Sequence, residues 1–120
     1  MSPDTDTPTG NDIPTRVVVV GPDRGLGAAF EAQGATVERV EGVATLDRLE
    51  AAGIAEADVL VLTDAGEAST VPGAMTVNAG LRVVVYDDST MPEFVRATVD
   101  LAVDPNLMDP DVVAEELADG

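Results

Sequence analysis

The stretch VVVVGPDRGLGAAF, residues 17–30, predicts the fold of this chain. Its run of β-branched valines suits a strand that is buried on both faces of a parallel sheet. Glycines at positions 21, 25 and 27 follow, and the alanine-rich segment after them predicts a short helix that ends at Gly34. A strand, a glycine-rich turn and a helix in this order indicate the start of an α/β domain.

The same alternation of strands and helices continues along the chain. Two more apolar runs, residues 57–63 and 81–86, predict buried strands, residues 35–41 alternate as an edge strand does, and residues 100–104 predict a short last strand. The remaining segments predict helices over residues 45–53, 69–80, 90–98 and 109–120. Their start signals are Thr45, Pro72, the capping-box pair Thr90 and Glu93, and Asp109 with Pro110. The pattern predicts one three-layer α/β domain with a parallel sheet over residues 16–120.

The composition is strongly acidic. The chain has 23 acidic residues, six arginines and no lysine, which gives a net charge of −17. We interpret this balance as that of an extreme halophile, because dense salt screens the repulsion between surface carboxylates. The negative electrostatic field of such a surface repels nucleic acid, and the sequence has no basic patch to offset it, so nucleic acid is excluded as a partner. Residues 1–15, rich in Pro, Thr and Asp, predict a disordered acidic tail.

Missing residue types narrow the chemistry further. The chain has no Cys and no His, which excludes disulfides, thiolate metal sites and cysteine nucleophiles and removes the commonest general base. No apolar run approaches the roughly 20 residues of a membrane helix, and no signal peptide is visible. We therefore expect a cytoplasmic protein that does not insert directly into a membrane.

The glycine loop is the strongest functional signal. Glycines between a strand and a helix allow a tight turn, close approach of backbone amides to a phosphate, and close packing of the helix on the strand. The helix N-terminus adds N–H groups and partial positive charge. The predicted nucleotide site accordingly includes Gly21, Arg24, Gly25 and Gly27. This hypothesis requires loop amides that are free of side-chain partners; in the alternative, the glycines only turn the chain and Arg24 forms a surface salt bridge.

The motifs resemble two known families. The spacing G-x-x-x-G-x-G over residues 21–27 is similar to the loop of the short-chain dehydrogenases, but their catalytic Tyr–Lys pair has no match in a chain without lysine. Over residues 16–105, the order of the segments GATVERVEG, GVAT, LEAAGIAEADVLVLTDAGE, NAGLRVVVY and VDLAVDP resembles the RCK or TrkA-N domain. That domain is the Rossmann-like nucleotide-sensing unit of potassium channels and transporters.

The resemblance to RCK domains implies three further site residues. Glu41 matches the acidic residue that holds the ribose hydroxyls, and Thr63 and Asp64 match the Thr and the acidic residue beside the bound nucleotide. Glu41 runs directly into residues 42–45, so a helix and a strand of the family are missing here, and Val43 replaces an Asp. The shortened sheet should have about five strands in the order 2-1-3-4-5, in a Rossmann-like domain of flavodoxin size with the site at the carboxyl ends of its strands.

These implied residues also have simpler explanations. Glu41 could be one more solvated carboxylate of an acidic protein, and the Thr63 hydroxyl could cap the next segment. Asp64, Asp87 and Asp88 could ligate Mg²⁺, but paired aspartates also suit a solvated loop, so we predict no metal site. No residue pair marks acid–base catalysis, and we do not expect an enzyme.

Two hypotheses about function follow. In the first, the chain is a small regulatory or sensor domain of RCK type that binds NAD(H) or an adenine nucleotide and acts through a separate transporter or effector chain. In the second, it is a degenerate Rossmann-like protein that has lost its ligand and acts through protein contacts, for example as a homodimer. Side chains that could form an apolar contact face, or else pack in the core, are Met75, Met91, Phe94 and Met108.

Overall fold

Five parallel strands form the centre of the molecule. The computed structural model describes residues 15–41, 44–64, 69–87 and 99–118. Its strands are β2 (Arg16–Val20), β3 (Thr36–Val40), β4 (Val59–Leu62), β5 (Arg82–Tyr86) and β6 (Leu101–Val103). They lie in the order β3-β2-β4-β5-β6, and each neighbouring pair is parallel. This is the predicted 2-1-3-4-5 order, so the predicted fold class is confirmed.

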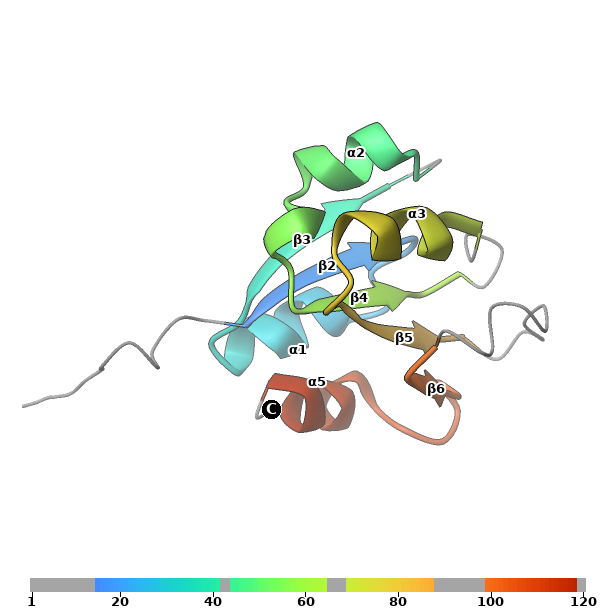
Figure 1. The fold of residues 1–120 in the computed structure, drawn as a ribbon. Coiled ribbons are helices and arrows are strands. Elements are labelled where there is room, and N and C mark those ends of the chain that lie inside the picture. Colours follow the sequence, from blue (N-terminus) through green and yellow to red (C-terminus); the bar gives the residue numbers. More distant parts are fainter. Residues whose placement is uncertain (1–14, 42–43, 65–68, 88–98, 119–120) are drawn as a thin grey trace, which may run out of the picture.

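Helices cover both faces of the sheet (Figure 1). On one face lie α1 (Leu26–Ala32) and α5 (Pro110–Ala118), whose buried side chains share one apolar cluster. On the other face lie α2 (Leu46–Ala51), the 3-10 turn η2 (Ile54–Glu56) and α3 (Val71–Val77). The domain therefore has the three layers that the sequence predicts, with the sheet in the middle.

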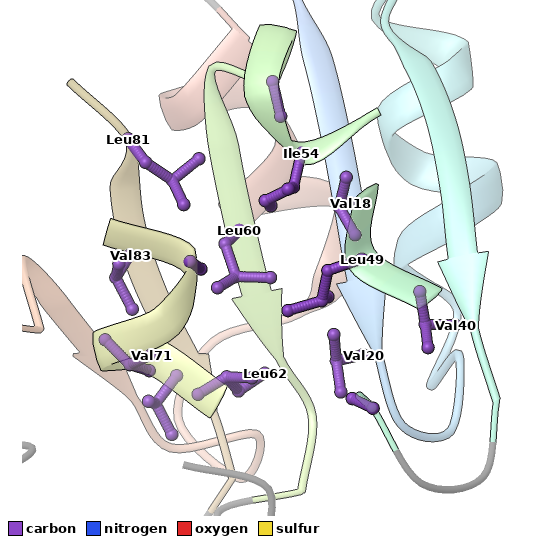
Figure 2. Packing of buried hydrophobic residues seen from close by; sticks show 14 residues of the cluster. Val18, Val20, Val40, Leu49, Ile54, Leu60, Leu62, Val71, Leu81 and Val83 are labelled. Atoms are coloured by element: carbon purple, nitrogen blue, oxygen red, sulfur yellow. The ribbon is translucent and has the colours of Figure 1, made fainter. Parts of the chain in front are cut away.

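The two apolar clusters follow from the alternation of side chains along each strand. In β2, Val18 and Val20 point toward α2 and α3, whereas Val17 and Val19 point toward α1 and α5. Figure 2 shows the first cluster, in which Leu60 of β4 lies among side chains from the neighbouring strands and the covering helices. A continuous apolar run is what a strand needs when both of its faces are buried.

The helix boundaries follow local signals. The Thr45 hydroxyl accepts a hydrogen bond from the Arg48 N–H at 3.3 Å, so it caps α2 as predicted. Pro72 lies in the first turn of α3, and Pro110 is the first residue of α5, both as predicted. The helix predicted over residues 45–53 forms as α2, with Thr45 as its N-cap and Ala52 as its C-cap; the chain then turns at Gly53 and continues as η2.

Some predictions fall outside the described residues. These are the helix over residues 90–98, all of the acidic tail except Thr15, and the side chains of Met91, Phe94 and Asp88. Met75 and Met108 are described; they are partly buried, and each packs against one of the two core clusters. Among the described residues, no helix combines the length and apolarity that crossing a bilayer requires.

Tyr86, the last residue of β5, anchors the segment that leads into α5. Its side chain is 2 % exposed, and its hydroxyl donates a hydrogen bond to the Met108 carbonyl at 2.8 Å. Burial raises the pKa of Tyr86 above its ordinary value of 10.0; the negative charge of Asp109 raises it further, and Arg24 opposes the shift. The folded chain therefore holds the phenolic proton more tightly than the unfolded chain does.

This shift predicts a loss of stability in alkali. Stability should be complete below about pH 10, the unfolded pKa, and should fall as the pH rises toward the higher folded pKa. Tyr86 is the only tyrosine in a chain without lysine or cysteine, so no other side chain titrates in this range. Urea unfolding of the wild type and Tyr86→Phe between about pH 8 and 11 measures the effect. The variant should lack the alkaline decline, and a parallel decline in both proteins would contradict the prediction.

Candidate functional site

The carboxyl ends of β2, β3 and β4 bring the predicted site residues to one edge of the sheet. Hydrogen bonds join these ends: the Gly21 N–H donates to the Val40 carbonyl at 3.2 Å, and the Thr63 N–H donates to the Val20 carbonyl at 2.9 Å. The predicted site residues in the segments that leave the three strands are Gly21, Arg24, Gly25, Glu41, Thr63 and Asp64, and Gly27 lies in the first turn of α1. The sheet order therefore gathers residues that lie up to 43 positions apart in the sequence.

Asp23 fills the glycine loop from within. Its Oδ2 accepts a hydrogen bond from the Gly25 N–H and its Oδ1 accepts one from the Gly27 N–H, each at 3.0 Å. A Cβ atom added at Gly27 would lie 2.5 Å from this Oδ1, so the glycine leaves room for the carboxylate. The nucleotide hypothesis requires free loop amides, and at Gly25 and Gly27 this requirement is not met.

An arginine from the neighbouring strand lies beside the Asp23 carboxylate. Arg39 Nε lies 3.5 Å from Asp23 Oδ1, and Arg39 Nη2 lies 3.0 Å from Glu41 Oε2. The Glu41 carbonyl also accepts a hydrogen bond from Arg48 Nη1 at 2.6 Å. Glu41, the predicted ribose ligand, is therefore paired with a side chain of β3, the strand that it follows, although its own side chain is 70 % exposed.

Arg24 joins the loop to the ends of β4 and β5. Its Nε donates a hydrogen bond to the Thr63 carbonyl at 2.9 Å, and its Nη2 lies 3.6 Å from Asp87 Oδ1. The Asp87 side chain is only 6 % exposed, so this ion pair compensates a buried negative charge. Arg24 has a φ of 52°, a left-handed conformation that is uncommon for residues other than glycine. The sequence left two uses open for Arg24, a place in the nucleotide site or a salt bridge. The structure contains the salt bridge, which connects the glycine loop to Asp87 at the end of β5.

Thr63 faces the loop and not the solvent. Its side chain is fully buried, and its hydroxyl lies within hydrogen-bond distance of the Val20 carbonyl, at 3.2 Å, and of the Pro22 carbonyl. The hydroxyl therefore ties the end of β4 to the backbone that leaves β2.

Sequence reasoning missed the role of three residues. No prediction gave Asp23 a role in the glycine loop, and neither Arg39 nor the pairing of Asp87 with Arg24 was anticipated. A local signal for Asp23 does exist, because aspartate side chains often accept hydrogen bonds from backbone N–H groups two residues further on and at helix starts. The two ion pairs bring together different strands, so no local signal could identify them. Within residues 15–41, 44–64, 69–87 and 99–118, no group of three acidic side chains is placed to hold a metal ion.

The fold and this edge define a class of protein: a three-layer α/β domain of Rossmann and flavodoxin type whose glycine loop is occupied by its own aspartate. The match of a family model over residues 17–117 makes the identification more specific. The chain belongs to the DUF7126 family, a family of unknown function.

Two solved structures share the fold. A protein described as pilus assembly-related, from Burkholderia pseudomallei K96243, is 17 % identical with a TM-score of 0.63, and the match covers 86 % of each chain. The CpaE protein of Burkholderia thailandensis E264, described as a pilus assembly protein, is 14 % identical with a TM-score of 0.55 over 86 % of this chain and 94 % of that one. At these identities the likeness concerns the fold alone. Comparison with curated proteins gives no match.

Proposed function

We propose that this chain is a non-catalytic interaction domain, a degenerate Rossmann-like module that acts through protein contacts. The observation that supports the proposal is the Asp23 carboxylate on the N–H groups of Gly25 and Gly27. A phosphate would compete for the same donors against a carboxylate that is tethered two residues away and therefore has a high effective concentration. The net charge of −17 adds long-range repulsion of any anionic ligand.

The remaining polar groups at this edge are also used inside the protein. Arg24 pairs with Asp87, and Arg39 pairs with Asp23 and Glu41. Arg39 and Glu41 line a cavity of about 230 Å³, but each of these charged groups is already paired with an opposite charge of the protein itself, so none is left free for a substrate. This arrangement supports a domain without catalytic activity.

Several wider expectations belong to the same proposal. The acidic composition supports a cytoplasmic protein from a salt-rich cell. The partner could be a separate effector or transporter chain, or a second copy of this chain. The sensor hypothesis and the likeness to RCK domains stay predictions, and the experiment below separates the two hypotheses.

The direct test is a titration of the folded protein in molar KCl with NADH, NAD, ATP, AMP and a cyclic dinucleotide, followed through backbone amide chemical shifts. We expect no saturable change at Gly25 or Gly27, because their N–H groups already donate to Asp23. Saturation of both amides by one of these nucleotides would instead establish the sensor hypothesis and identify its ligand.

Asp23→Ala provides the positive half of the test. It removes one negative charge and frees two N–H groups, so pyrophosphate should shift the Gly25 and Gly27 resonances in this variant. The matched control is Asp111→Ala, which removes the same charge from an exposed position in the first turn of α5. A control that responded as strongly as Asp23→Ala would show that the effect comes from net charge and not from the loop.

A further inference from the structure

The outer edge of β3 carries backbone groups that have no partner among the described residues. This strand lies at one edge of the sheet and pairs only with β2 (Figure 1). Thr36 donates to the Thr15 carbonyl at 2.8 Å and Val40 accepts from the Gly21 N–H at 3.2 Å, so these residues face β2. Because backbone groups alternate in direction along a strand, the N–H and carbonyl groups of Val37 and Arg39 face outward.

A groove accompanies this edge on the α2 side of the sheet. Two cavities, of about 340 and 230 Å³, lie between β3 and the end of α2, and both are lined by Glu38, Ala51 and Ala52. The alanines leave space because their side chains are short. Glu38 is exposed, and its carboxylate has no ion-pair partner in the part of the chain that the structure describes.

Charge decides which occupant fits. A second copy paired about Glu38 would place two glutamates opposite each other, and each chain carries a net charge of −17. An added strand with a basic residue opposite Glu38 would meet an unpaired carboxylate of the opposite sign. Three cations lie near this groove. Arg16, in the larger cavity, lies on β2 and therefore one strand further in. Arg39 and Arg48 line the smaller cavity beside Glu38, but Arg39 pairs with Asp23 and Glu41, and Arg48 donates to the Glu41 carbonyl.

We propose that β3 is a docking edge for an extended segment of a partner protein, which adds to the sheet as a further strand and places a basic side chain over Glu38. The outward groups of Val37 and Arg39 offer two donors and two acceptors to such a segment, and β-branched residues suit its extended backbone. The inference rests on the proposed interaction function and assigns that function a surface and a partner chemistry.

The test uses two blocked nonapeptides as probes: acetyl-Ser-Thr-Val-Thr-Arg-Thr-Val-Thr-Ser-amide and the same peptide with Glu in place of Arg. Each is titrated into the full-length protein at the lowest KCl concentration that keeps it folded, and amide shifts and hydrogen exchange are recorded. We expect the Arg peptide to shift the Val37 and Arg39 amides and to slow their exchange. It should bind about tenfold more tightly than the Glu peptide, and this preference should shrink as KCl is raised.

Variants of the edge separate docking from general charge attraction. Val37→Pro removes one outward N–H while Thr36, Glu38 and Val40 keep their bonds to β2, and it should abolish binding. Val37→Thr keeps that N–H and should bind the Arg peptide as the wild type does. Glu38→Arg should reverse the preference in favour of the Glu peptide, and it tests the proposal even if the proline variant does not fold.

Three results would overturn the inference. The first is the absence of shifts at Val37 and Arg39 at millimolar peptide, and the second is equal binding by Val37→Pro and Val37→Thr. The third is a shift of the same two amides with protein concentration alone, which would assign the edge to a second copy. None of these results changes the nucleotide titration, so failure of the docking edge can be distinguished from failure of the proposed function.

Discussion

Leu60→Ala is expected to lower the free energy of unfolding by about 3 kcal/mol. Leu60 lies on β4, between β2 and β5, and is completely buried. Its side chain packs in the cluster that Figure 2 shows, beneath the helices that cover this face. Truncation removes buried methyl groups and leaves a cavity that a sheet paired on both sides of β4 cannot close. Urea unfolding at constant KCl concentration measures this loss. It is a large part of the total free energy of unfolding, which is about 5–15 kcal/mol for typical domains.

Leu46→Ala is the matched control. It deletes the same atoms from the start of α2, where the side chain is 42 % exposed. We expect a loss below about 1 kcal/mol, because water already reaches much of this side chain and no closed cavity remains. Similar losses in the two variants would contradict the assignment of Leu60 to the core.

Gly21→Ala is expected to destabilise the fold by about 3 kcal/mol through strain at the end of β2. Gly21 has a φ of 102°, which residues with a side chain rarely adopt. An added Cβ would lie 2.7 Å from Thr63 Oγ1 and 3.3 Å from the Asp64 backbone nitrogen. The hydroxyl is buried and the nitrogen belongs to the main chain, so neither can move away without disturbing the end of β4. Urea unfolding again measures the effect.

Two further variants separate backbone strain from the steric contact. Gly34→Ala has a similar φ of 86° but no neighbouring atom within 4 Å of the added Cβ, so it should cost only about 1 kcal/mol. In the Thr63→Ala background, which lacks the crowded hydroxyl, Gly21→Ala should cost less than in the wild type. An equal cost in both backgrounds would show that the contact with Thr63 is unimportant.

The elements of the fold could be predicted from local patterns, because each strand and most helices carry their own signal. The valine run at residues 17–20 has the composition of a strand with two buried faces, and it forms the interior strand β2, which pairs with β3 on one side and β4 on the other. Thr45 and Pro110 mark helix starts because a hydroxyl can satisfy an unpaired N–H and a proline needs none. The turn η2 was not predicted, since a three-residue 3-10 turn leaves no periodic pattern.

The candidate site was predictable in its location but not in its contacts. Parallel strands bring their carboxyl ends to one edge, so the segments after β2, β3 and β4 had to meet there. The glycine spacing is compatible with two kinds of loop: one whose amides donate hydrogen bonds to a bound phosphate, and one whose amides donate to a side chain of the protein. The Asp23 carboxylate takes this place because the loop folds back on itself and Gly27 leaves room for it.

The sequence by itself therefore determined the strands, most helix starts and the edge where they converge, because hydrophobic alternation and capping act over a few residues. It also determined the acidic field of the molecule, which depends only on composition. Only the tertiary structure decided that Asp23 occupies the loop and that Arg24 pairs with the buried Asp87. It also decided that the backbone groups of Val37 and Arg39 lie on the side of β3 that faces away from β2. These features depend on distances between segments that are remote in the chain, and such distances exist only after the sheet has assembled.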